Sequence, residues 1–150
     1  MAKEQERTDG PEILERCGLR AAPVAVPQEA PSVSAAVYAV TGFEVEPTVT
    51  VPTSSPRAGE ILDREWHRCA AAAPLYDEKG RFLILPPVSG GSETGWIAVT
   101  DPGGEDLPSR VAAATGSPEF IAASLDGRHL CAATVEDDDY WVVSHEFMDS

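Results

Sequence analysis

The stretch that most constrains this chain runs from residue 80 to residue 100, where two short apolar runs flank a segment rich in turn formers. The runs are residues 82–85 (FLIL) and 96–99 (WIAV), and neither contains a polar side chain. Residues 86–95 between them are mostly Pro, Gly, Ser and Thr, which favour turns. The pattern predicts two adjacent antiparallel strands, and the missing polar alternation predicts burial on both faces.

Residues 43–51 alternate strictly, with Phe, Val and Pro at odd positions and Glu and Thr at even ones. This period of two predicts a half-buried strand. The small apolar residues 32–40 would form its hairpin partner across Thr41-Gly42. Pro47 cannot donate to a strand ladder, so the strand at 43–51 is expected at a sheet edge or at a bulge.

The longest predicted helix covers residues 56–73, with Ser54 or Ser55 as its cap and Pro74 after its end. Its apolar residues recur at helical spacing; they are Leu62, Trp66, Cys69 and Ala73. Asp63 and His67 lie mostly off this stripe, so we expect His67 to be exposed. Trp66 should pack the helix on the sheet.

Short helices are predicted over residues 11–18 and 107–115, the second capped by Asp106 and ended by Gly116. Three further strands are predicted over residues 119–125, 128–135 and 140–147, the first two joined by an Asp126-Gly127 turn. The fold class is therefore α+β: a mainly antiparallel sheet of about six to seven strands, with one long helix and one or two short helices packed on one face.

The length of 150 residues suits a single domain. We expect residues 1–10, which are dense in charge, to be a disordered leader, and residues 11–150 to form one globular domain. The polar N-terminus is no secretory signal, and no apolar run approaches the ~18 residues of a membrane span. Three widely separated cysteines suit a reducing compartment, so the expected location is the cytoplasm.

His129 and Cys131 are two residues apart on a predicted strand, so both side chains could reach one ion. The compact ligand pairs of zinc sites are absent from the sequence, however. We therefore expect no metal and no cofactor, with Cys69 and Cys131 in the core. Gly90 and Gly91 lack the Lys and the following helix of a phosphate loop.

The charge is the unusual quantity: 25 acidic and 11 basic residues give a formal net charge of −14. Such a surface repels nucleic acid and anionic membranes and attracts basic proteins. The densest acidic run is immediately followed by two aromatic residues: Glu136, Asp137, Asp138, Asp139, Tyr140 and Trp141. The run is either a plain solvated turn or a docking surface in which carboxylates steer and aromatic rings supply buried area.

These features favour a small acidic cytosolic protein that binds a basic protein partner, for example as an inhibitor or immunity protein against a toxin such as a nuclease. No catalytic motif is visible, so we expect no enzyme activity. One alternative is a small hydrolase that uses His129 and His145 with nearby carboxylates. The other is a structural or adaptor subunit of a larger assembly.

Overall fold

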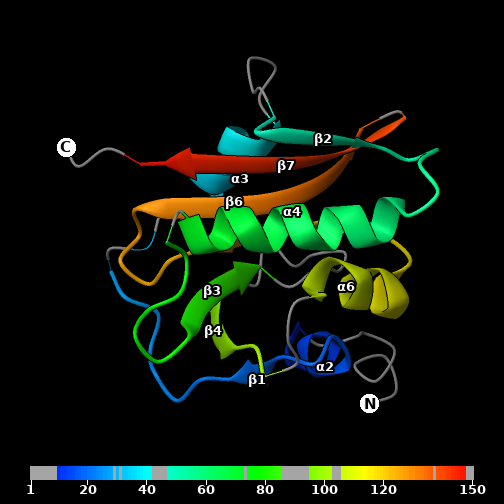
Figure 1. The fold of residues 1–150 in the computed structure, drawn as a ribbon. Coiled ribbons are helices and arrows are strands. Elements are labelled where there is room, and N and C mark those ends of the chain that lie inside the picture. Colours follow the sequence, from blue (N-terminus) through cyan, green and yellow to red (C-terminus); the bar gives the residue numbers. More distant parts are fainter. Residues whose placement is uncertain are drawn as a thin grey trace, which may run out of the picture.

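The computed structural model describes residues 10–28, 30, 32–41, 47–72, 74–85, 95–102, 106–136 and 138–147. Within these residues the strands form one seven-stranded sheet in the order β1-β4-β3-β5-β6-β7-β2 (Figure 1). All neighbouring strands are antiparallel. The fold is thus α+β, with a 15-residue helix and shorter helices packed on the sheet, which confirms the predicted class.

The helices are α2 (Gly10–Arg16), α3 (Val33–Thr41), α4 (Ala58–Ala72) and α6 (Leu107–Thr115). The strands are β1 (Arg20–Ala21), β2 (Val49–Pro52), β3 (Arg81–Leu85), β4 (Ile97–Thr100), β5 (Phe120–Ala123), β6 (His129–Glu136) and β7 (Asp139–Glu146). Of the predicted leader, residues 1–9 lie outside the described residues, and Gly10 begins α2.

The two apolar runs form β3 and β4, which pair antiparallel with Ile84 opposite Ile97. All of residues 82–85 are buried, as the unbroken run predicted, because the sheet is covered on both sides here. The C-terminal strands form the predicted meander. At the β5–β6 turn, the Asp126 carboxylate accepts hydrogen bonds from the Ser124 hydroxyl (2.5 Å) and the Arg128 amide (3.0 Å).

The predicted hairpin before the long helix is wrong in its first arm. Residues 33–41 form the helix α3, and the Ser32 hydroxyl accepts a hydrogen bond from the Ala35 amide at its start. Ala36 and Val40, one helical turn apart, are buried on the sheet. A short run of small apolar residues has no periodicity that separates strand from helix, and its alanines favour helix.

The alternating segment does end in a strand at the sheet edge, as Pro47 indicated. Residues 42–46 lie outside the described residues. β2 begins at Val49 and, among the described strands, pairs with β7 alone. Val51 is buried and Thr50 is exposed, which confirms the alternation over the part of the strand that is described.

The helices cover both faces of the sheet, not one. The face that carries Phe82, Ile84 and Val142 packs with residues of α2, α4 and α6; we call it the α4 face. The opposite face carries Leu130 and Ala132 beneath α3; we call it the α3 face. Figure 1 shows α4 in front of β6 and α3 behind the sheet. The misassigned segment 33–41 is the reason that the second layer was not predicted.

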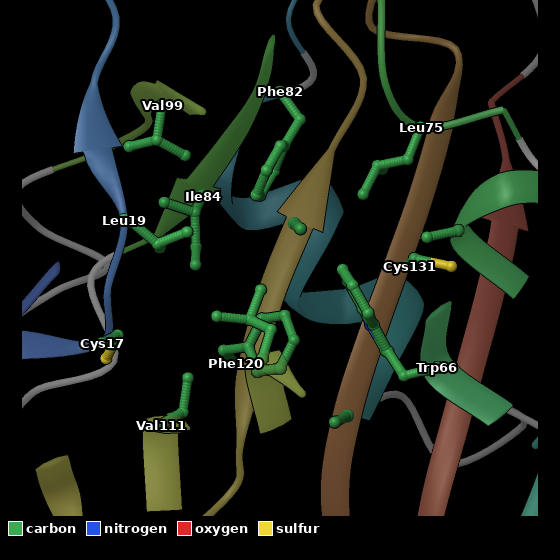
Figure 2. Packing of buried hydrophobic residues seen from close by; sticks show 14 of the residues in the cluster. Cys17, Leu19, Trp66, Leu75, Phe82, Ile84, Val99, Val111, Phe120 and Cys131 are labelled. Atoms are coloured by element: carbon green, nitrogen blue, oxygen red, sulfur yellow. The ribbon is translucent and has the colours of Figure 1, made fainter. Parts of the chain in front are cut away.

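Trp66 is the centre of the α4 face. It is 0% exposed, and its ring centroid lies 4.9 Å from that of Phe120 on β5. Figure 2 shows it beside Phe120 and Cys131, within the buried cluster that α4 presses onto the sheet. Its indole Nε1 is buried without a hydrogen-bond partner, so the ring contributes through its apolar area alone.

Arg110 joins α2, α6 and the end of β4. Its guanidinium forms a two-bond ion pair with Asp101 (2.9 Å each) and donates to the Cys17 carbonyl (2.8 Å). Its Nε also donates to Asp106 (2.7 Å). A Cβ at Gly18, whose φ is +82°, would lie 2.8 Å from the guanidinium. Gly18 therefore permits both the turn after α2 and the close approach of Arg110.

We predict that Trp66→Ala lowers the free energy of unfolding by about 3–5 kcal/mol, because it leaves a large cavity between α4 and β5. Trp66→Phe should cost much less, since it keeps most of the apolar area and removes an unpaired buried N–H. Urea unfolding measures both values. A loss below about 1 kcal/mol for Trp66→Ala would mean that α4 does not depend on this side chain.

Candidate functional site

The acidic run forms the turn between β6 and β7. Glu136 and Asp139 are the last pair of the ladder, both partly buried, and Asp138 is exposed between them. Asp137 lies outside the described residues. The Asp138 carbonyl accepts hydrogen bonds from the Thr53 amide (2.8 Å) and hydroxyl (2.9 Å). The turn is therefore fastened to the end of β2, although its carboxylates remain available to solvent or a partner.

Tyr140 and Trp141 lie on opposite faces of the sheet. Tyr140 is opposite the buried Val51 and packs against the core on the α4 face. Trp141 is opposite Thr50 and Thr134, so it lies on the α3 face and is partly exposed. The sequence hypothesis grouped both rings as one docking element. Consecutive strand residues point to opposite faces, so one partner surface on the α3 face can meet Trp141 but not Tyr140.

The turn lacks compensating charge within the described residues. Four acidic residues at this end of the sheet take part in no ion pair there: Glu119, Glu136, Asp138 and Asp139. The ion pairs of the described part lie elsewhere; they are Arg57–Glu60, Arg64–Glu65, Arg68–Glu65, Arg81–Asp77, Arg110–Asp101 and Arg110–Asp106. Within the described residues, the negative charge of this end of the sheet is therefore not neutralised by an ion pair.

Thr134 is a residue that the sequence analysis missed. It lies on β6 directly opposite Trp141 and is 7% exposed, yet its hydroxyl has no hydrogen-bond partner. Its position two residues before Glu136 was a usable signal, because residues two apart on a strand share a face. Nothing in the sequence indicated that the hydroxyl would be unpaired.

His129 and His145, the candidates for hydrolase chemistry, lie on opposite faces of the sheet. His129 is opposite Glu146, whereas His145 is opposite Leu130. The His145 ring packs edge-on against Phe147, with the two ring centroids 4.6 Å apart. His129 and His145 are offset by one position along the paired strands, and neighbouring positions point to opposite faces. The two imidazoles therefore cannot reach the same substrate atom. This geometry supports no shared acid–base pair.

His129 and Cys131 do share the α4 face, as their spacing predicted. Cys131 is buried, and burial raises the pKa of its thiol to about 12. Metal ions bind the thiolate, which this environment disfavours. In the described part of the chain no group of three or more His, Cys, Asp or Glu side chains could hold a metal ion.

The polar side chains of α4 hold the beginning of α6. The Asp63 carboxylate accepts hydrogen bonds from the Ser109 amide (2.9 Å) and hydroxyl (2.6 Å). His67 Nε2 accepts one from the Leu107 amide (3.2 Å). Asp63 is therefore buried and His67 is only partly exposed, which corrects the predicted exposure of His67. Asp106 makes no side-chain cap, because its carboxylate binds Arg110.

This cluster contains Ser, His and Asp but is not arranged for nucleophilic catalysis. The Ser109 hydroxyl donates to Asp63, whereas an activated serine would donate to an imidazole. His67 Nε2 already faces the Leu107 amide. Asp63 and His67 accept hydrogen bonds from free amides at the α6 N-terminus, and the Ser109 hydroxyl adds a second bond to Asp63. That is a structural role.

Comparisons with protein-family models, with curated proteins and with solved structures each gave no match. Among the described helices, none is both long enough and apolar enough to cross a membrane.

We predict that Asp63→Ala lowers the free energy of unfolding by about 2–3 kcal/mol, because it removes two hydrogen bonds to a carboxylate and uncaps α6. Asp63→Asn keeps an acceptor for the Ser109 amide and should cost less. Glu60→Ala, at an exposed position of the same helix, is the control and should change stability by no more than about 0.5 kcal/mol. Equal losses for Asp63→Ala and Glu60→Ala would contradict the capping role.

The pH dependence of the same contact has a definite sign. Burial raises the pKa of Asp63, and the hydrogen bonds from Ser109 only partly oppose this. As pH falls from neutral toward about 4, the folded protein takes up this proton before the unfolded chain does. The stability of the native protein relative to Asp63→Asn should therefore rise as pH falls. If the stability of the native protein relative to Asp63→Asn stays constant or decreases as pH falls, the burial of this charge is contradicted.

We predict that only Cys69 reacts with a thiol reagent in the folded protein. Cys17 and Cys131 are buried, whereas Cys69 is partly exposed. Burial raises the pKa of all three thiols, so reaction at Cys69 should be slow. Counting modified thiols at pH 8 should give one for native protein, none for Cys69→Ser, and three after denaturation. Modification of Cys17 or Cys131 before unfolding would disprove the packing described for them.

Proposed function

We propose that this chain is an acidic protein-binding module that engages a basic protein partner through the β6–β7 end of its sheet. The observation that carries the proposal is the group of four carboxylates at this end, Glu119, Glu136, Asp138 and Asp139, which form no ion pair within the described residues. Such a local field accelerates encounter with a basic surface and orients it.

The turn also suits recognition because it is held in place. The two hydrogen bonds from Thr53 to the Asp138 carbonyl join it to β2, so the carboxylates need little ordering when a partner arrives. The partly exposed Trp141 lies on the adjoining strand. Indole rings often supply much of the binding energy at interfaces.

The form of this function that we favour is an inhibitor or immunity protein that neutralises a basic toxin, such as a nuclease, in the cytosol. The net charge of −14 opposes that of a nucleic-acid-binding enzyme, and carboxylates can occupy the basic surface that binds phosphates. Three free cysteines suit a reducing compartment. Binding rather than catalysis is also supported by the divergent positions of His129 and His145.

The test is affinity capture from the source cell with native protein and with a neutralised turn, Asp137→Asn, Asp138→Asn and Asp139→Asn combined. We expect the native chain to capture a basic protein that the neutralised variant does not capture. Its association with the variant should be several-fold slower at low salt, and the difference should shrink as salt is raised. The variant should unfold at the same temperature as the native chain or slightly above it.

A matched control removes three charges elsewhere, with Glu12→Gln, Glu60→Gln and Glu78→Gln at exposed positions. This control should associate with the partner at nearly the native rate. If both variants slow association equally, only net charge matters. If neither does, or if no basic protein is captured, the proposed docking surface is wrong.

A further inference from the structure

Four side chains form a compact group on the α3 face at the β6–β7 end. Thr134 and Trp141 are directly opposed on the two strands, and Glu136 and Asp139 are the next opposed pair. Because residues two apart share a face, all four lie on the same side. Opposed side chains have Cβ atoms about 5 Å apart, so two carboxylates, one indole and one hydroxyl occupy a single small patch.

The patch is assigned to the α3 face by its neighbours. Ala132 and Leu130 precede Thr134 in the same alternation and are buried beneath α3. On the other side, Thr50 and Pro52 of the edge strand are opposite Trp141 and Asp139 and are exposed. Trp141, Glu136 and Asp139 are themselves partly exposed, so a ligand can reach the patch from the open edge of the sheet.

The unpaired hydroxyl of Thr134 is the independent sign that the patch receives a ligand. The side chain is 7% exposed and its Oγ1 has no hydrogen-bond partner. Buried polar groups are nearly always hydrogen-bonded, and an orphan is destabilising. A ligand that donates a hydrogen bond here would satisfy this acceptor while its positive charge meets Glu136 and Asp139. Because Thr134 is buried, a neighbouring side chain must move for a ligand to reach the hydroxyl, and side-chain shifts of this kind are common on binding.

We propose that this patch binds the guanidinium of an arginine side chain of the partner; the partner itself rests on the function proposed above. A guanidinium is planar, presents several donors at once and can pair with a carboxylate through two bonds. It also stacks on indole rings, where its charge is attracted to the ring face. The patch offers each of these contacts within one arginine head group. An ammonium is a compact point charge that cannot use them all, so arginine is preferred over lysine.

The test uses three small probes: Nα-acetylarginine amide, its lysine analogue and its uncharged citrulline analogue. We expect the arginine probe to give saturable NMR shifts of the Trp141 indole N–H and the Thr134 amide. The lysine probe should bind several-fold more weakly and the citrulline probe should not saturate. Glu136→Gln with Asp139→Asn should weaken arginine binding about tenfold. The charge-matched control, Glu12→Gln with Glu78→Gln, should leave it within twofold.

Thr134→Val tests the hydroxyl separately, because valine has nearly the same shape. It should raise the melting temperature, since it removes an unpaired buried group, yet weaken arginine binding about threefold. The site would be overturned if the arginine and citrulline probes behave alike. It would also be overturned if arginine binding is unchanged in Thr134→Val or in Glu136→Gln with Asp139→Asn.

If these tests fail while partner capture still depends on the turn, the arginine site is wrong and the proposed function stands. If the arginine probe binds as expected but no partner depends on the turn, the proposed function fails and the site stands.

Discussion

The helical layer depends on the contact that α4 makes with both the sheet and α6. Trp66 fills the space above β5, and one turn of the same helix presents Asp63 and His67 to the first amides of α6. A helix N-terminus leaves several amides without partners, so α6 could not be buried beside α4 without these acceptors. Arg110, on α6, then fixes the end of β4 and the turn after α2. The packing of one helix thus determines how three separate segments are placed.

The same arrangement determines where the negative charge remains. Five arginines of the described part are engaged with carboxylates on or near the helical layer: Arg57, Arg64, Arg68, Arg81 and Arg110. Arg128, the one base after Arg110, lies at the opposite end of β6 from Glu136, and eight strand residues span roughly 26 Å. Exposed charges are screened over about 8 Å at physiological salt. The described carboxylates of the β6–β7 turn are therefore neutralised by no ion pair within the described residues.

The sequence predicted most of the sheet because its strands carry strong local signals. The unbroken run at 82–85 and the Asp126-Gly127 turn each correspond to observed elements. It failed at residues 33–41, where small apolar residues have no distinguishing period and the contact of α3 with β6 decides the outcome. The opposite orientations of Tyr140 and Trp141 were predictable from strand alternation alone. The unpaired hydroxyl of Thr134 was not, because burial and hydrogen-bond partners depend on the packing of the folded chain.

The most direct test of the account is photo-crosslinking in the source cell with a benzophenone side chain placed at Thr50. This residue is exposed, lies at the open edge of the sheet and is directly opposite Trp141. A second protein carries the same group at Arg64, which is exposed on α4. The account predicts a covalent adduct with a basic protein from position 50, reduced by Glu136→Gln with Asp139→Asn, and little or none from position 64. An adduct from position 64 alone would contradict the account. So would an adduct from position 50 that forms equally well when Glu136→Gln and Asp139→Asn are present.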